Sequence, residues 1–257
     1  MPFEPGVATT VNTIPLSVPE IAGNEWKYIK ECLDTNWVSS VGSFVDRFES
    51  ELAAYIGTKH GVAVINGTAA LHIALLVAGV EPDDEVVVST LSFVAPANAI
   101  RYIGAWPVFM DADPQYWQMD AEKTQLFLEN ECIWKNGHLE NKSTGRRVKA
   151  ILPVHILGHP CDMEPILRVA RKFDLHVVED ASESLGAKYR EQMAGRLAMD
   201  RVGRQESKLS GLRVAFIGKL ASMTHREASE WLLGQGGQAV ENVGTAVDLV
   251  VVGTTTP

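Results

Sequence analysis

Residues 85–112, EVVVSTLSFVAPANAIRYIGAWPVFMDA, carry the pattern that decides the fold. The stretch begins with the short apolar run EVVVS and ends with another, WPVFMDA. Between them, APANAIRYIG has the length and spacing of a helix. Strands that are apolar throughout, separated by helices, indicate a mostly parallel sheet with helices on both faces. The sequence therefore predicts an α/β protein.

The same alternation continues on both sides, from about residue 20 to about residue 190. Further strands are expected at 61–65, 149–155 and 175–180, and further helices at 19–35, 43–57, 68–79 and 163–174. The polar stretch 131–149 is expected to be a solvated loop. In sheets of this kind ligands bind beyond the carboxyl ends of the strands, so candidate site residues are sought there.

Charge and composition exclude several functional classes. The net charge of −9 argues against a general affinity for nucleic acid or anionic membranes. The 3 cysteines are too few for a disulfide framework, which favours a reduced, cytoplasmic compartment. We also expect neither a secretory signal nor a membrane span, because the first 20 residues show no basic start followed by an apolar run and no apolar stretch approaches the length that spans a bilayer.

Two strand-to-helix junctions carry candidate binding residues. Gly67 and Thr68 begin a helix, where unpaired amides and the helix dipole favour an anion. The alternative is that Thr68 simply caps the helix. Phe93 lies in a similar loop, where its ring could stack on a flat ligand or pack against the sheet edge.

Two later junctions add an imidazole and a carboxylate. His155 belongs to PVHILGHPCD, whose spacing matches no standard zinc pattern, so His155 is interpreted as a pocket or packing residue. Asp180 follows the strand at 175–180 and, taken alone, would be a helix cap or a surface acid. An anion cradle, an aromatic face, an imidazole and an acid at one sheet edge suit a planar, phosphorylated, nitrogen-containing ring. Pyridoxal 5'-phosphate is such a ring, and an acid facing its pyridine nitrogen keeps that nitrogen protonated.

At these residues the sequence resembles the DegT/DnrJ/StrS family of pyridoxal-phosphate sugar aminotransferases, from about residue 14 to about residue 190. The motifs are NWVSSVGSFVDRFE, NGTAALHIAL, TLSFVAPANAI, PVHILGHPCDM and VVEDASESLGA. The resemblance implies the large domain of the aspartate-aminotransferase-like fold, present here incompletely. It also implies roles for individual residues. Gly67, Thr68 and Ala69 would contact the cofactor phosphate, Phe93 would lie on the face of the ring, and Asp180 would pair with the pyridine nitrogen. Glu183 would lie near the ring hydroxyl, and the sugar pocket would involve Trp37, Ser40 and His155.

By the same resemblance, the family function is amination of nucleotide-linked keto-sugars, here of a legionaminic type. The implied partners are the nucleotide-sugar substrate, glutamate as amino donor and a second copy of the chain in a homodimer.

One part of the family pattern is missing. Family members carry the Schiff-base lysine in a Ser-Phe-x-x-x-Lys motif, which this sequence lacks. Lys208 stands near the expected separation, but its context, RQESKLSG, is typical of a solvated lysine on a linker. We therefore expect weak or no cofactor binding and no transamination, and whether this chain is an enzyme stays open.

The pattern changes near residue 191. The expected organisation is an aminotransferase-like large domain at 1–190, a linker at 191–209 and a segment at 210–257 that resembles part of a BRCT domain. Three hypotheses follow: a sugar aminotransferase, a non-catalytic binding or scaffold protein, or a fusion of two gene fragments.

Overall fold

The computed structural model describes residues 18–39 and 41–198, together with residues 213–217, 233, 238–240 and 249–252. The chain divides into two compact units, Met1–Ser43 and Phe44–Pro257. In the first unit the helix α1 (Glu25–Asp34) has no buried residue. The second unit contains the sheet and the candidate site. No helix among the described residues combines the length and apolar character required to cross a bilayer.

The main sheet of the second unit has six strands in the order β2-β1-β5-β4-β3, with β6 also paired to β5. β1 (Glu85–Ser89) lies between β2 (Trp106–Met110) and β5 (Arg147–Leu152), and both pairings are parallel. β6 (His176–Val177) is parallel to β5 as well. The predicted mostly parallel α/β sheet is confirmed.

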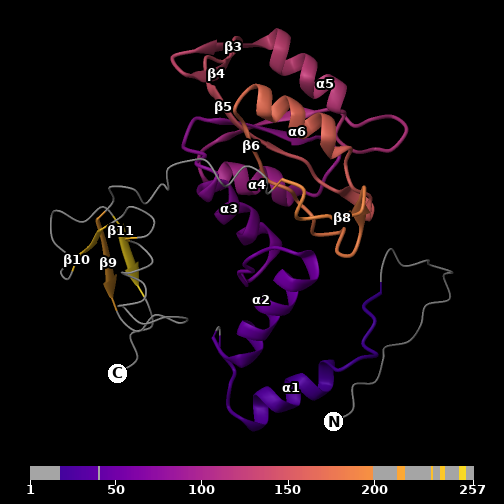
Figure 1. Cartoon of the computed structure of the whole chain (residues 1–257), viewed down its shortest axis with the longest axis vertical. Helices are drawn as coiled ribbons and strands as arrows, with labels where there is room; N and C mark the ends of the chain where they lie inside the picture. Colours follow the sequence, from indigo (N-terminus) through magenta and orange to yellow (C-terminus); the bar gives the residue numbers. More distant parts are fainter. Residues whose placement is uncertain are drawn as a thin grey trace, which may run out of the picture. The chain divides into compact units, whose positions relative to one another are not determined.

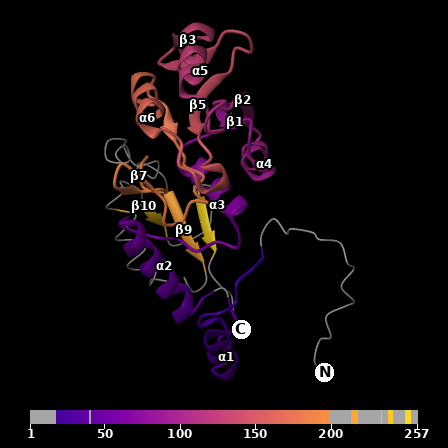
Figure 2. The ribbon, with the colours of Figure 1, turned by 90° about the vertical axis from the view of Figure 1, so that its right-hand side faces the viewer.

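Helices cover both faces of this sheet, as Figures 1 and 2 show for α4 and α6 on opposite sides. Every residue of β1 is buried, because alternate side chains point into two separate cores. Val87 packs into the core that holds α6 (Met163–Lys172), whereas Val86 and Val88 pack into the core that holds α3 (Gly67–Val77) and α4 (Val94–Tyr102). The unbroken apolar run of β1 is the sequence signature of this double coverage.

The polar stretch 131–149, expected to be a solvated loop, instead extends the sheet. It forms the hairpin β3 (Cys132–Lys135) and β4 (His138–Asn141), preceded by α5 (Ala121–Leu126) and a short π-helix, Phe127–Glu131. Buried polar bonds attach the hairpin to β1, because Glu85 accepts hydrogen bonds from Asn141 Nδ2 (2.8 Å) and Thr144 Oγ1 (2.7 Å). The prediction was wrong because a polar stretch was expected to be solvated. Instead, the Glu85 carboxylate is buried together with the side chains that donate hydrogen bonds to it, and an apolar pattern does not reveal such pairs.

The expected strand at 61–65 is also absent from the described structure. Val62 is 78% exposed and Ile65 is 92% exposed. The amide of Ala63 bonds to the Glu49 carboxylate (2.7 Å) on α2 (Ser43–Ile56) and not to a neighbouring strand. An apolar run becomes a strand only where another strand pairs with it, and none of the described strands does so here.

The folded unit continues past the expected boundary at residue 190. β7 (Lys188–Tyr189) pairs with β8 (Gln192–Met193), and both Ala194 and Leu197 are buried. Residues 191–198 therefore pack as part of the domain, although they were expected to begin a linker.

Three short strands lie in the last part of the chain: β9 (Arg213–Ile217), β10 (Gln238–Val240) and β11 (Leu249–Val252). They form a parallel sheet in the order β10-β9-β11.

Candidate functional site

The carboxyl ends of β1, β5 and β6 meet at one edge of the sheet, where the sequence predicted a site. The start of α3 supplies the candidate anion cradle. Asn66 caps this helix, and its side-chain oxygen accepts from the amide of Ala69 (2.9 Å). Within residues 41–198, the amides of Gly67 and Thr68 have no hydrogen-bond acceptor. Two of the three predicted phosphate amides are thus available, while the Ala69 amide is already engaged.

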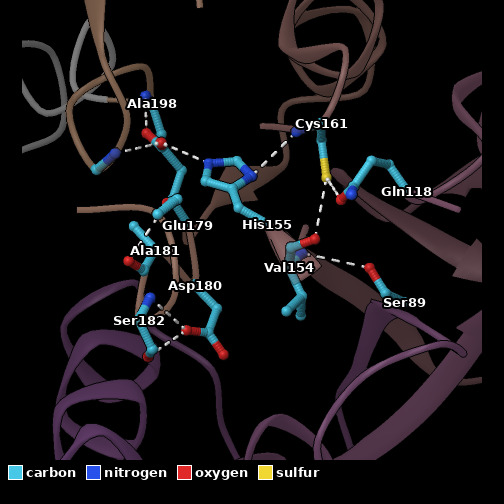
Figure 3. Close-up of polar contacts among 12 residues, drawn as sticks. Ser89, Gln118, Val154, His155, Cys161, Glu179, Asp180, Ala181, Ser182 and Ala198 are labelled. Atoms are coloured by element: carbon cyan, nitrogen blue, oxygen red, sulfur yellow. Dashed lines mark hydrogen bonds and ion pairs between the residues drawn. The ribbon is translucent and has the colours of Figure 1, made fainter. Parts of the chain in front are cut away.

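Asp180 is held at the sheet edge by its backbone. Its amide donates to Pro153 O (3.0 Å), and its carbonyl accepts from His155 N (3.0 Å). The residue is 7% exposed, so its carboxylate lies against the protein and not in bulk solvent. Figure 3 shows one carboxylate oxygen of Asp180 bonded to Ser182, and no donor among the described residues bonds to the other oxygen.

Asp180 and the start of α3 are neighbours in space, although 113 residues separate Gly67 from Asp180 in the sequence (180 − 67 = 113). Ser182 connects them: its hydroxyl bonds to Asp180 Oδ1 (2.6 Å), and a Cβ built on Gly67 would lie 3.3 Å from the same hydroxyl. The structure therefore brings together the predicted anion cradle and the predicted acid.

Phe93 stands at the N-cap position of α4, and the residue is 73% exposed. The alternative that the ring packs against the sheet edge does not describe this structure. An open aromatic ring directly after β1 leaves a face on which a flat ligand can stack.

His155 is fully buried, with both ring nitrogens engaged (Figure 3). Nδ1 accepts from the amide of Cys161 (3.1 Å), so the proton lies on Nε2, which faces the Glu179 carboxylate at 3.3 Å. This placement is that of a packing residue, the second of the two interpretations of His155. Burial raises the pKa of the Cys161 thiol to about 12, so the thiol stays neutral and unreactive.

Glu179 is a buried acid that the sequence analysis did not single out. Its side chain is 4% exposed, and it accepts from the amides of Gly195 (2.9 Å) and Ala198 (2.5 Å) besides facing His155. The carboxylate thus binds residues 191–198 to the segment that follows β6, through two of their backbone amides. Nothing in the local pattern distinguishes this acid from the neighbouring Asp180.

Glu183 fixes the loop after β5. Its carboxylate accepts from the amide of Leu157 (2.5 Å), which has a left-handed backbone with φ of 56°. Its predicted place beside a ring hydroxyl stays a prediction. Ser182 was also missed, although an Asp followed two residues later by Ser is a common pattern for a local side-chain turn.

Three other predicted residues lie outside the described part of the second unit. Trp37 lies in the first unit, where its ring packs beside Gly42. Ser40 and Lys208 lie outside the described residues.

The described residues fit pyridoxal 5'-phosphate. Free amides at a helix start suit its phosphate, an exposed aromatic ring suits its face, and a carboxylate oxygen without a protein donor suits its pyridine nitrogen. Among the described residues, no group of three or more His, Cys, Asp or Glu side chains could hold a metal ion.

Comparisons with known proteins agree with this chemistry. Residues 19–202 match the DegT/DnrJ/EryC1/StrS aminotransferase family. The chain is 45% identical over 184 residues to the GDP-perosamine synthase of Caulobacter vibrioides, covering 72% of this chain and 45% of that protein. It is 41% identical over 182 residues to the GDP-perosamine synthase of Escherichia coli O157:H7, covering 71% and 46% respectively.

Among solved structures, the aminotransferase from Psychrobacter cryohalolentis superimposes with a TM-score of 0.58 at 30% identity, covering 70% of this chain and 42% of that chain. The chain thus spans about half the length of the curated relatives it matches (45% and 46%). The expected resemblance of residues 210–257 to a BRCT domain is not supported by these comparisons, and the family match ends at residue 202.

Proposed function

This chain belongs to the DegT/DnrJ/EryC1/StrS aminotransferase family, and we propose that it retains the pyridoxal 5'-phosphate site with which the family aminates nucleotide-linked keto-sugars. The observation that carries the proposal is the spatial pairing of Asp180 with the free amides at the start of α3. Family and structural neighbours are pyridoxal-phosphate aminotransferases, so the cofactor is the one these residues fit.

The proposed roles follow from the chemistry of each group. The amides of Gly67 and Thr68 bind the phosphate, favoured by the positive end of the α3 dipole. The Phe93 ring covers one face of the cofactor and excludes water from it. Asp180 holds a proton on the pyridine nitrogen. When bound, the cofactor supplies an electron sink for the carbon that carries the amine.

The proposed substrate is a GDP-linked keto-sugar, with glutamate as the amino donor. Support comes from the two relatives reported above, which are both named GDP-perosamine synthases. These names favour a GDP-linked sugar over the legionaminic-type substrate that the sequence suggested. Assembly as a homodimer is part of the same proposal and rests on the family resemblance.

Turnover is a separate question, because the Ser-Phe-x-x-x-Lys motif is missing from this sequence. We therefore propose that this polypeptide binds the cofactor weakly and without a covalent bond, and does not transaminate. Borohydride reduction with peptide mapping tests this point. A stoichiometric adduct at Lys208 together with amination of a GDP-keto-sugar would overturn it.

Cofactor binding is tested by titrating the chain with pyridoxal 5'-phosphate and following the cofactor absorbance. Asp180→Asn keeps the side-chain shape and removes the charge, and it should weaken binding about 10- to 100-fold, the value of one charged hydrogen bond. Asp174→Asn is the matched control, because Asp174 is exposed and asparagine tolerates its left-handed backbone (φ 50°). If the native chain shows no saturable binding, the proposal fails, and a non-catalytic scaffold or a fusion of gene fragments becomes the better account.

A further inference from the structure

The orientation of the Asp180 carboxylate depends on a neighbour two residues along the chain. Backbone hydrogen bonds to Pro153 and His155 fix the main chain of Asp180, and Val154 bridges to it as in a parallel ladder. Only the two side-chain torsions of Asp180 remain to be set. Whatever bonds to its oxygens therefore decides which oxygen faces the candidate cofactor position.

Ser182 supplies that bond twice. Its amide donates to Asp180 Oδ1 at 3.1 Å, and its hydroxyl donates to the same oxygen at 2.6 Å. Among the described residues, no donor bonds to Oδ2, and Oδ2 is not sealed from solvent. Both Ser182 donors thus bond to Oδ1, and Oδ2 remains available to a ligand (Figure 3).

The Ser182 hydroxyl also lies against the start of α3. A Cβ at Gly67 would come within 3.3 Å of it, which is closer than most real contacts of this kind. Glycine at position 67 therefore leaves room both for an anion at the amides and for this hydroxyl. The hydroxyl is situated between the two groups that would hold the phosphate and the ring nitrogen.

We propose that Ser182 is a positioning residue for the cofactor: its hydroxyl holds Asp180 Oδ1 and thereby turns Oδ2 toward the pyridine nitrogen, where it can accept a hydrogen bond from the protonated ring. This inference rests on the proposed function. When the hydroxyl is lost, only the Ser182 amide still bonds to Oδ1, so the carboxylate can turn away from the ring. The ring nitrogen then loses part of the hydrogen bond that favours its protonated form.

A purely structural role predicts something different. The amide of Ser182 alone closes the local turn, as the backbone does in many Asp-initiated turns. Ser182→Ala keeps that amide bond and removes only the hydroxyl. Because Ser182 is exposed, the variant should fold like the native chain, and thermal unfolding checks this.

The experiment measures two quantities for pyridoxal 5'-phosphate labelled with ¹⁵N in its ring. These are the dissociation constant and the ¹⁵N chemical shift, which reports whether the nitrogen is protonated. We expect the native chain to bind with a protonated nitrogen, and Ser182→Ala to bind about 3- to 10-fold more weakly with a shift toward the neutral form. Ser182→Thr restores the hydroxyl and should restore both values. Ser50→Ala, which removes an exposed hydroxyl bonded to Asp46 O on α2, should change neither.

The possible outcomes distinguish a failure of the proposed Ser182 role from a failure of the proposed cofactor binding. If the native chain binds and Ser182→Ala matches it in both affinity and ¹⁵N shift, the role of Ser182 is overturned and the proposed function stands. If affinity falls without a change in the ¹⁵N shift, Ser182 is only structural, and the inference is equally overturned. If the native chain binds no cofactor, both are overturned.

Discussion

Replacing Glu179 should loosen residues 191–198, which bond to its carboxylate through backbone amides. The Glu179 carboxylate is 4% exposed, accepts from the amides of Gly195 and Ala198, and faces His155 Nε2 at 3.3 Å. Glu179→Gln keeps the volume but turns one acceptor into a donor that meets other donors. A buried donor left unpaired costs about 1–3 kcal/mol, so the variant should lose about 2 kcal/mol. Glu179→Ala leaves both amides unpaired and should lose about 4 kcal/mol.

Amide hydrogen exchange is the appropriate assay, because it reads local opening residue by residue. A loss of about 2 kcal/mol corresponds to roughly 30-fold faster exchange at Gly195 and Ala198. Glu191→Gln is the matched control, since it makes the same chemical change at an exposed residue. If Glu179→Gln left exchange at both amides within about 2-fold of the native rate, our assignment of Glu179 as the group that binds both amides would be wrong.

Two further predictions concern stability and reactivity. Arg147 makes two hydrogen bonds of 2.7 Å each to Asp84, whose side chain is 6% exposed. Arg147→Ala leaves this buried carboxylate with the Glu81 amide as its remaining described donor and should cost about 2 kcal/mol of unfolding free energy in urea; an unchanged urea midpoint would contradict this. Burial raises the pKa of both Cys132 and Cys161 to about 12, so iodoacetamide at pH 8 should label Cys32 first and the other two only on unfolding. Mass spectrometry of timed samples can show this order, and prompt labelling of Cys161 would contradict the burial of its thiol.

The strands that the sequence predicted well are those whose environment is uniform. β1 is buried on both faces, so its apolar run reads directly as a central strand. The run at 61–65 looks similar, yet it forms no strand in the described structure, because pairing depends on a neighbour that composition does not reveal. The hairpin β3–β4 was missed because its polar sequence looks solvated. Its attachment to β1 depends on the buried Glu85, whose hydrogen-bond donors lie 56 and 59 residues further along the chain.

The candidate site was predictable where single residues follow strand ends. Gly67, Phe93 and Asp180 all lie at such junctions, and the parallel sheet brings those ends to one edge. The contacts that organise the edge were not predictable in the same way. Ser182 bonds to Asp180 through a side-chain geometry, and Glu179 binds amides that lie 16 and 19 residues further along.

The central claim is that this sheet edge holds pyridoxal 5'-phosphate with Asp180 at its ring nitrogen. A crystal structure of the chain soaked with the cofactor tests it most directly. Our account predicts the phosphate within hydrogen-bond distance of the Gly67 and Thr68 amides, and the pyridine nitrogen bonded to Asp180 Oδ2. A cofactor joined covalently to any side chain of this molecule, with its ring nitrogen facing a group other than Asp180, would contradict it.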